Sequence, residues 1–297
     1  MLMRDQESSL FNASRFFAIR GAIDESKGEI VISGCDARHI KDVLRMELGG
    51  DIVVCDGEGK DFNCKIVSVE RERVVAGIVS SEASKGEPPI KVCLFQAVPK
   101  GDKFDLVVQK CVEAGASEIV PVLTVRTLFK LQQGGKQNKL DRWNRISYEA
   151  AKQSGRGIVP VVNGFMSFSD AIKKAGCMSD MVVIPYERMQ GVSLKSVLRG
   201  SGLQESGRQE SRLQQDGLQQ GRPQGSGQQQ SVLSGGQGGT AALRSISVFI
   251  GPEGGFEQME VDLAVESGAV AVSLGPRILR TETAGVVVLS AIMYELE

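Results

Sequence analysis

Histidine is almost missing from this sequence, and its scarcity limits the chemistry that the chain can perform. One histidine, His39, occurs among 297 residues. Most zinc sites are thereby excluded, as is histidine-based acid–base catalysis away from residue 39. His39 lies in a helix-like stretch, where a structural or surface role is the simpler interpretation. We expect no bound metal.

Paired cysteines and long apolar runs are also absent. The six cysteines form no Cys-x-x-Cys pair, so we expect reduced, mostly buried thiols. No run approaches the ~18 apolar residues of a membrane span. Residues 1–20 have neither the apolar core of a signal peptide nor the acid-poor composition of a transit peptide. A cytoplasmic protein without a membrane partner is therefore expected.

The net charge of −1 hides an uneven distribution along the chain. Residues 86–199 hold 17 Lys and Arg against 10 Asp and Glu, a balance of 17 − 10 = +7. Residues 245–297 hold 2 basic residues against 8 acidic ones. The middle of the chain is therefore basic, while its C-terminal part is acidic.

The first part of the sequence has the pattern of short strands. The strands are expected at 15–20, 29–33, 51–57, 62–70 and 73–80, with one helix at 36–46. The stretch DGEGKD, residues 56–61, has the composition of a hairpin turn. These features predict a small β-barrel or sandwich over residues 1–84, followed by a linker at 81–89, where glycine and two prolines occur.

From residue 90 to 297, buried strands alternate with helices, a pattern that predicts a mostly parallel, helix-covered α/β sheet. Residues 200–240 interrupt it with 11 Gln and 11 Gly, and such a segment buries too little apolar surface to fold, so a disordered insert is expected. The strands are expected at 90–98, 118–123, 181–187, 245–251 and 269–275, and the helices at 102–115, 139–155, 257–268 and 283–296.

Two junctions follow strands and open helices. The first, FIGPEGGFEQME, has three glycines that let backbone approach a ligand, yet it lacks the Gly-Lys-Ser/Thr of a phosphate-binding loop. The second, SLGPRILRTETAG, has Thr281 or Thr283 as a helix cap and Glu282 beside the positive end of the helix dipole. Capping leaves Arg277 and Arg280 unexplained. Ordinary turn punctuation remains an alternative, but two such junctions at strand ends favour one shared ligand site.

A basic helix is the third feature. Arg142, Arg145, Glu149, Lys152 and Arg156 are spaced to share one helical face, opposite Leu140 and Trp143. Between Arg126 and Arg156 there are eight basic residues and two acidic ones, or 8 − 2 = +6. A solvated face is the common explanation, and a phosphate-contacting surface is the more specific one.

The pair FIGPEGGF and LGPRILRTETA resembles the C-terminal signatures of the SPOUT methyltransferases, and most closely those of the RsmE family. RFF, HIKDVLRMELGGDIVVCDGEGKDF, QAVPKGDKFDLVVQKCVEAGASEIVPVLTVRT and EAAKQSGRGIVPVV fit the same family. Members of that family methylate N3 of a uridine in bacterial small-subunit (16S) ribosomal RNA. The resemblance covers nearly the whole chain except residues 1–13 and the Gln/Gly insert.

The resemblance implies a fold, a cofactor and an assembly. It implies a C-terminal α/β SPOUT domain with a parallel sheet and a trefoil knot, an N-terminal PUA-like β-barrel that binds RNA, and a homodimer. S-adenosylmethionine would be the methyl donor, held largely by backbone groups of three loops. Its binding residues would be Ile184, Pro185, Tyr186, Glu187, Gly251, Pro252, Glu253, Gly254, Gly255, Leu274, Gly275, Ile278, Leu279 and Thr283.

Uracil N3 carries a proton at neutral pH, and its removal spreads negative charge to O2 and O4, where a guanidinium can stabilise it. We expect Arg156 and Arg126 in this role, with Arg280 as a third candidate and Glu282 as a base or as a support for an arginine. The expected partner is small-subunit rRNA or the assembled small subunit. Residues expected to contact RNA are Arg15, Arg45, Arg142, Arg145 and Lys152.

Two other kinds of protein remain as alternatives. A different SPOUT enzyme would methylate tRNA or a ribose 2′-hydroxyl, although the N-terminal barrel and the wording of LGPRILRTETA argue against it. A non-catalytic ribosome-assembly factor would bind RNA without the cofactor and would transfer no methyl group.

Overall fold

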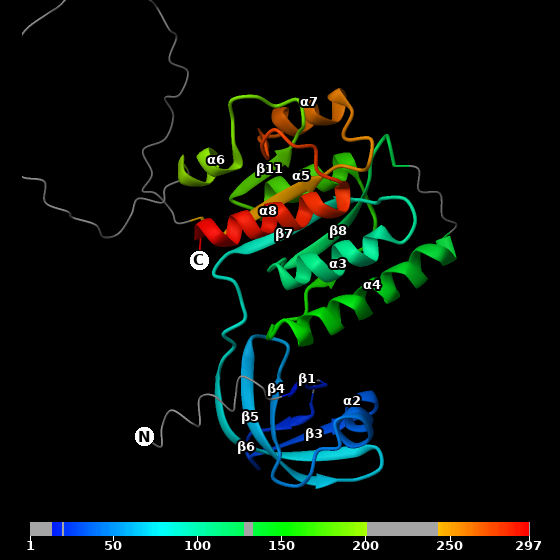
Figure 1. The fold of residues 1–297 in the computed structure, drawn as a ribbon, viewed down its shortest axis with the longest axis vertical. Coiled ribbons are helices and arrows are strands. Elements are labelled where there is room, and N and C mark those ends of the chain that lie inside the picture. Colours follow the sequence, from blue (N-terminus) through cyan, green and yellow to red (C-terminus); the bar gives the residue numbers. More distant parts are fainter. Residues whose placement is uncertain (1–13, 20, 128–132, 201–242, 297) are drawn as a thin grey trace, which may run out of the picture.

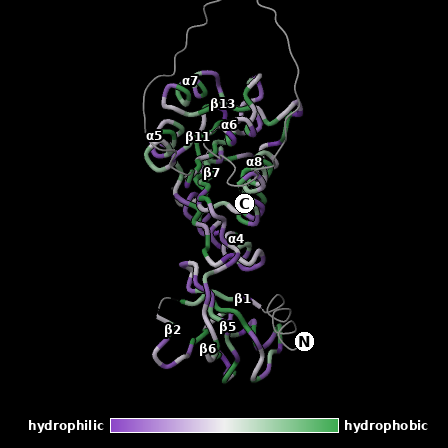
Figure 2. The backbone as a smooth tube through the Cα atoms, turned by 90° about the vertical axis from the view of Figure 1, so that its left-hand side faces the viewer, coloured by the Kyte–Doolittle hydropathy of each residue, from purple (hydrophilic) through white to green (hydrophobic). Residues whose placement is uncertain are grey.

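The computed structural model describes residues 14–19, 21–127, 133–200 and 243–296. Two domains are joined at a narrow waist, with the smaller, strand-rich N-terminal domain below the larger α/β domain in Figure 1. Figure 2 shows the same waist from the side. Residues 201–240 lie outside the described residues, so the predicted disorder of the insert stays a prediction.

The N-terminal domain is a sheet that curls around its own apolar core. Its strands are β1 (Ser14–Phe17), β2 (Ile23–Asp24), β3 (Glu29–Ser33), β4 (Asp51–Cys55), β5 (Lys60–Val69) and β6 (Arg73–Ala83). They pair in the order β1-β4-β5-β6-β3-β2, and β1 runs parallel to β4 while the other described pairs are antiparallel. Alternate residues point inward, because side chains of a strand alternate between its faces. Phe16, Ile30, Ile52 and Phe62 form the centre of this core.

Local chemistry explains the predicted hairpin turn and limits the predicted helix. The Asp56 carboxylate accepts hydrogen bonds from the N–H groups of Glu58 and Lys60, which closes the turn between β4 and β5. The helix expected at 36–46 is shorter: α2 spans Cys35–Arg38 and continues as a π-helix, His39–Val43. Arg45 then adopts a left-handed backbone with φ of 50°, which a helix cannot accommodate.

The C-terminal domain contains a parallel sheet. Its strands are β7 (Lys91–Ala97), β8 (Glu118–Leu123), β9 (Val161–Val162), β10 (Met166–Ser167), β11 (Met181–Pro185), β12 (Ser245–Ile250) and β13 (Val270–Val272). The order is β10-β8-β7-β12-β11-β13, with β9 beside β8, and every pair is parallel. The predicted parallel α/β sheet is therefore confirmed. The trefoil knot stays a prediction, because strand pairing does not define how loops thread.

Helices cover both faces of this sheet (Figure 1). One apolar cluster lies under α3 (Lys103–Glu113), α4 (Gln133–Gln153), α6 (Leu194–Gly200) and α8 (Thr281–Leu296). The other lies under α5 (Phe168–Met178) and α7 (Gln258–Glu266). Strand β7 serves both clusters, since Val92 and Leu94 face the first and Cys93 and Phe95 the second. Burial on both faces explains why these strands are continuous apolar runs.

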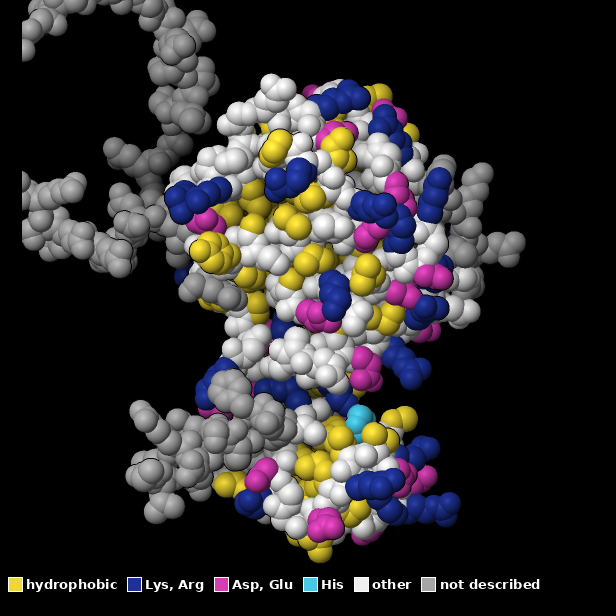
Figure 3. All heavy atoms as spheres, viewed as in Figure 1, with side chains coloured by type: hydrophobic (Ala, Val, Ile, Leu, Met, Phe, Trp, Pro, Cys, Tyr) yellow, Lys and Arg dark blue, Asp and Glu magenta, His cyan; other side chains and the backbone are white. Residues whose placement is uncertain are grey.

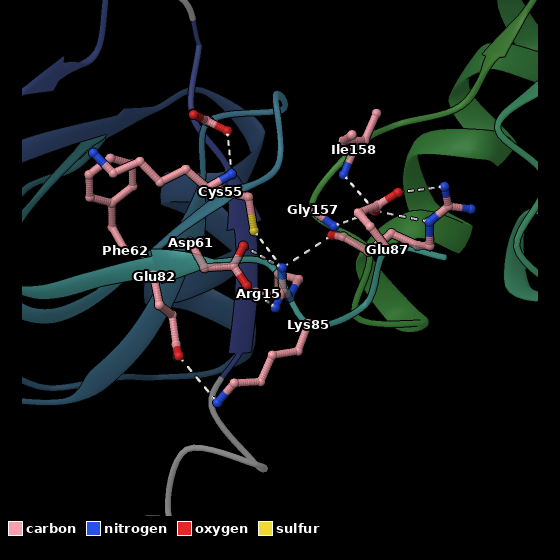
Figure 4. Close-up of polar contacts among 12 residues, drawn as sticks. Arg15, Cys55, Asp61, Phe62, Glu82, Lys85, Glu87, Gly157 and Ile158 are labelled. Atoms are coloured by element: carbon pink, nitrogen blue, oxygen red, sulfur yellow. Dashed lines mark hydrogen bonds and ion pairs between the residues drawn. The ribbon is translucent and has the colours of Figure 1, made fainter. Parts of the chain in front are cut away.

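The two domains are locked by buried charges at the waist (Figure 4). Glu87, in the linker, accepts two hydrogen bonds from the Arg156 guanidinium at 3.0 and 2.8 Å, and two more from the N–H groups of Gly157 and Ile158. Arg156 Nη1 also donates to the carbonyl oxygens of Val112 and Ala116. The linker thus follows the loop after α4 closely rather than hanging free between the domains.

Candidate active site

A pocket of about 910 Å³ lies at the carboxyl ends of β11, β12 and β13, which are neighbours in the sheet. Its walls are the loops that follow these three strands, and α3 adds one lysine. Open parallel sheets bind ligands at this edge, and the volume falls within the range of small-molecule sites. The residues expected there that do line it are Pro185, Tyr186, Glu187, Gly251, Pro252, Glu253, Gly254, Gly255, Leu274, Gly275, Ile278, Leu279, Arg280 and Glu282.

Glycine is required in the loop after β12 for two reasons. Gly255 has a φ of 68°, a left-handed conformation that L side chains rarely adopt. A Cβ at this position would also come within 3.0 Å of Glu187 Oε1, in the neighbouring loop. At Gly251 a Cβ would lie 3.3 Å from the Phe256 ring. The loops are therefore packed so closely that backbone, not side chains, forms this wall.

Thr281 ties two of the pocket loops together. Its Oγ1 donates a hydrogen bond of 2.6 Å to the carbonyl oxygen of Gly251 and accepts one of 2.9 Å from Gln96 Nε2. Gln96 is fully buried at the end of β7, and Thr281 is the first residue of α8. The threonine that looks like a simple helix cap in the sequence therefore fixes the spacing between the second and third loops.

Acidic and basic side chains meet at the mouth of the pocket. Lys103 Nζ lies 3.4 Å from Glu253 Oε1 and 3.6 Å from Glu282 Oε2. Burial acts to raise the pKa of Glu253, but hydrogen bonds from the N–H groups of Glu253 itself and Lys100, with the Lys103 ammonium, lower it overall. Sequence reasoning missed Lys103, since no local pattern links residue 103 to the two distant glutamates.

Arg126 supports the pocket from outside. Its guanidinium donates to the carbonyl oxygen of Gly254 and, at 2.8 Å from Nε, to the Glu257 carboxylate. The hydrogen bond from Arg126 lowers the pKa of Glu257. Arg126 does not line the pocket, so its observed role is to hold the Gly254–Gly255 turn in place.

Arg156 does not line the pocket, and the catalytic role expected for it stays a prediction. Its side chain is 3% exposed, and Glu87 and two backbone carbonyls occupy its guanidinium. A group so enclosed cannot reach a substrate without opening the joint between the domains. The helical spacing that groups Arg156 with Arg142 and Arg145 does not hold, because α4 ends at Gln153 and Arg156 lies in the loop that follows.

Two of the residues expected to contact RNA form ion pairs within the chain. Arg15 forms a bidentate ion pair with Asp61, at 2.9 and 2.7 Å, and is mostly buried. Lys152 is buried too, 2.8 Å from Asp36 Oδ1 and above the ring of Phe16. Both side chains are engaged in contacts within or between the domains, and their expected contact with RNA stays a prediction. Arg45, Arg142 and Arg145 are exposed, with Arg142 paired to Asp105.

Two expected cofactor residues also lie away from the pocket lining. Ile184 is fully buried in the apolar cluster under α5 and α7. Thr283 is exposed on the first turn of α8. Further residues that were not named individually as cofactor-binding also line the pocket: Met189, Gln190, Gly191, Ile250, Phe256, Ser273, Pro276, Arg277, Thr281 and Ala284.

Neither a metal centre nor a membrane span is found among the described residues. No group of three His, Cys, Asp or Glu side chains in these ranges is arranged to hold a metal ion. None of the described helices combines the length and apolar composition needed to cross a bilayer.

Comparison with known proteins identifies the class. A family model described as an RNA methyltransferase domain matches residues 86–207 and 225–293, and a model described as an RNA methyltransferase PUA domain matches residues 32–79. The chain is thus an RNA methyltransferase with a PUA-like N-terminal domain.

The relatives narrow this class further. Ribosomal RNA small subunit methyltransferase E of Bacillus subtilis is 32% identical over 266 residues, 90% of each chain. The protein of that name from Synechocystis is 30% identical, covering 90% of this chain and 74% of its own. The crystal structure of the Neisseria gonorrhoeae protein of that name, bound to S-adenosyl methionine, has a TM-score of 0.71 and 26% identity, covering 96% of this chain and 98% of its own. The chain belongs to the ribosomal RNA small subunit methyltransferase E family.

Proposed function

We propose that the chain transfers a methyl group from S-adenosylmethionine to N3 of a uridine in small-subunit ribosomal RNA. The observation that carries the proposal is the 910 Å³ pocket at three neighbouring strand ends, in a chain of this family. The pocket combines close-packed backbone with ionised side chains, the combination that suits a small, zwitterionic and partly apolar cofactor.

The residues of the pocket fit this cofactor. Gly251 and Gly255 leave backbone exposed where a Cβ would intrude, so the loops can grip an adenosyl group by main-chain hydrogen bonds. Glu187 and Glu253 line the same space, and their carboxylates complement a donor with a sulfonium and an ammonium group. When bound, the cofactor supplies an electrophilic methyl group. We assign its binding to the three loops at 185–191, 250–256 and 273–280.

The protein residues contribute positioning and charge. Holding the base in line with the methyl group removes much of the entropic barrier to transfer. Arg280 and Glu282 both line the pocket and are the two of the four expected catalytic side chains that can reach a substrate there. Arg126 is proposed to act indirectly, through the Gly254 turn.

RNA binding is proposed for the N-terminal domain, residues 1–84, acting with the exposed part of α4 on the methyltransferase domain, residues 90–297. Figure 3 displays Lys and Arg side chains on both sides of the waist between these domains. Arg45, Arg142 and Arg145 are accessible cations on the two sides, which supports a continuous contact with phosphates. Such contacts position the RNA rather than read its sequence.

A cytoplasmic homodimer is the proposed form of the protein. Ile278 and Tyr294 support dimerisation, since both are large apolar side chains and both are nearly fully exposed in the single chain. Size-exclusion chromatography with light scattering tests this part independently of activity. A monomer at micromolar concentration would contradict it.

Methyl transfer is tested directly with labelled S-adenosylmethionine and small ribosomal subunits that lack the modification. We expect one label per subunit, located by mass spectrometry at N3 of a single uridine. A label on a ribose 2′-hydroxyl, or on tRNA but not on subunits, would replace the proposed substrate. Binding of subunits without any transfer would overturn the enzymatic assignment.

A further inference from the structure

Lys103 is a pocket cation whose role neither the sequence motifs nor the family assignment explains. It is the first residue of α3 and reaches the pocket from the strand end of β7, outside the three loops that form the walls. Its ammonium group lies between Glu253 and Glu282, within 3.4 and 3.6 Å. One carboxylate would be enough to balance the charge of an ammonium group, whereas Lys103 has two carboxylates beside it, those of Glu253 and Glu282.

The two glutamates differ in how they are satisfied. Glu253 Oε1 accepts a hydrogen bond of 3.0 Å from the N–H of Lys100, so the backbone already holds it. Glu282 Oε2 is buried and has no hydrogen-bond partner among the described residues. A buried carboxylate oxygen left without a donor is costly, and a catalytic role is one of the recognised reasons for which native proteins retain such a group. A donor that enters the pocket is therefore expected to meet Glu282.

We propose that Lys103 and Glu282 act together on the target base, with Glu282 receiving its N3 proton and Lys103 neutralising the adjacent carbonyl oxygen. This inference rests on the proposed function. The N3–H bond breaks and the proton moves to the Glu282 carboxylate, which lines the pocket. The nitrogen electron pair then forms the bond to the methyl carbon, whose bond to sulfur breaks, and that electron pair stays on sulfur. Lys103 remains protonated throughout, and Glu282 afterwards releases its proton to water.

Removal of the N3 proton requires both a base and a cation, and the pair of Glu282 and Lys103 supplies both. A carboxylate is a weak base for an imide proton, so transfer to Glu282 is unfavourable unless the resulting anion is stabilised. A cation aimed at the place where charge develops supplies that stabilisation without reorganisation. Lys103 takes the part that the sequence suggests for Arg156, whose guanidinium is buried elsewhere.

The test is single-turnover methylation of small subunits by Lys103→Gln, with the affinity for S-adenosylmethionine measured by calorimetry. We expect the rate to fall about 100-fold, while the affinity for the cofactor and for the subunit changes less than about threefold. Lys103→Arg should recover at least a tenth of the lost rate. Lys110→Gln is the matched control, because Lys110 lies on the same helix with similar exposure and pairs with Glu113 on the surface.

The pH profile distinguishes proton transfer from a structural role. In Glu282→Gln the rate should fall about 100-fold at neutral pH and then rise about tenfold per pH unit as hydroxide replaces the missing base. The methylation rates of the wild-type protein and of Glu113→Gln should not change with pH over the same range, from neutral pH upward.

The outcomes separate the inference from the function on which it rests. If the wild-type protein methylates another atom, the proposed function fails. If it methylates uracil N3 but Lys103→Gln keeps its rate, or loses only cofactor affinity, the inference about the pair is overturned. A flat pH profile for Glu282→Gln would likewise exclude Glu282 as the proton acceptor. Circular dichroism and melting curves establish that each variant is folded.

Discussion

Arg15 and Arg156 meet at the joint between the two domains, where Arg15 Nη1 donates a hydrogen bond of 3.2 Å to the main-chain carbonyl oxygen of Arg156. Arg15 belongs to the first strand of the barrel and Arg156 to the loop after α4. Each guanidinium is neutralised within its own surroundings, by Asp61 and by Glu87 respectively. The joint therefore contains two separately compensated cations, and loss of either carboxylate leaves a buried cation behind.

Glu87→Gln should destabilise the protein by about 2 kcal/mol, because Arg156 would stay buried without its counter-charge. Urea unfolding measures the loss. Glu82→Gln is the control, since Glu82 pairs with Lys85 on the surface of the same segment and should cost less than about 0.5 kcal/mol. Equal losses for the two variants would mean that the joint adds no stability of its own.

Thr281→Val should weaken cofactor binding about tenfold, because the Gly251 carbonyl loses its donor and the two loops lose their link. Thr281→Ser keeps the hydroxyl and should bind nearly as well as the wild type. Thr283→Val, on the exposed side of the same helical turn, provides a matched control. Calorimetric titration with S-adenosylmethionine gives all three affinities. A Thr281→Val variant with unchanged affinity would contradict the role of this link.

Gly255→Ala and Gly268→Ala separate backbone strain from crowding. Both glycines have positive φ, 68° and 92°, so each alanine should cost about 1 kcal/mol of stability. A Cβ at Gly268 meets nothing within 4 Å, whereas at Gly255 it presses on Glu187. We therefore expect similar melting temperatures but a loss of cofactor affinity, more than tenfold, for Gly255→Ala alone. Equal affinities would mean that the approach of the two loops is irrelevant to binding.

Thiol labelling at pH 8 should divide the cysteines into two groups. Burial raises the pKa of Cys64 and of Cys111 to about 12, so these thiols stay protonated and unreactive at this pH. Burial also raises the pKa of Cys55 and of Cys93. Cys35 and Cys177 are exposed and should react with iodoacetamide first. Peptide mapping by mass spectrometry reads out each site, and labelling in urea provides the fully reactive reference. Early modification of Cys111 in the native protein would contradict the burial of α3.

The sequence predicted the alternation of strands and helices well because each buried strand is a short apolar run with a helix beside it. Helix α5 was missed although its signal is present: Phe168, Ala171, Ile172 and Ala175 are spaced as one buried helical face, and Ser167 caps its start. The short strands β2, β9 and β10 have too few residues for any periodicity to register.

The pocket loops could be found from the sequence, whereas the charged side chains could be placed only in part. The need for glycine depends on local backbone conformation, so the turn at Gly254 and Gly255 can be recognised from the sequence. The role of an arginine depends on what packs over it: Arg142 and Arg156 have helical spacing in the sequence, yet Arg142 is exposed on α4 and Arg156 is buried in the loop after it. Pairing between Lys103 and Glu282 is likewise a product of the fold, since the packing of α3 against α8 brings these remote segments together.

The parallel pairing of β7 with β12 also sets the order in which the molecule can be completed during synthesis. Residues 91–96 of β7 cannot form their backbone hydrogen bonds with β12 until residues 245–250 have been synthesised. The barrel, whose last strand ends at Ala83, contains the pairing partners of its own described strands and can fold while the rest is still being translated. The third wall of the pocket and the first turn of α8 emerge later still. A ribosome that stalls before residue 274 would thus release a folded barrel with no place for a methyl donor.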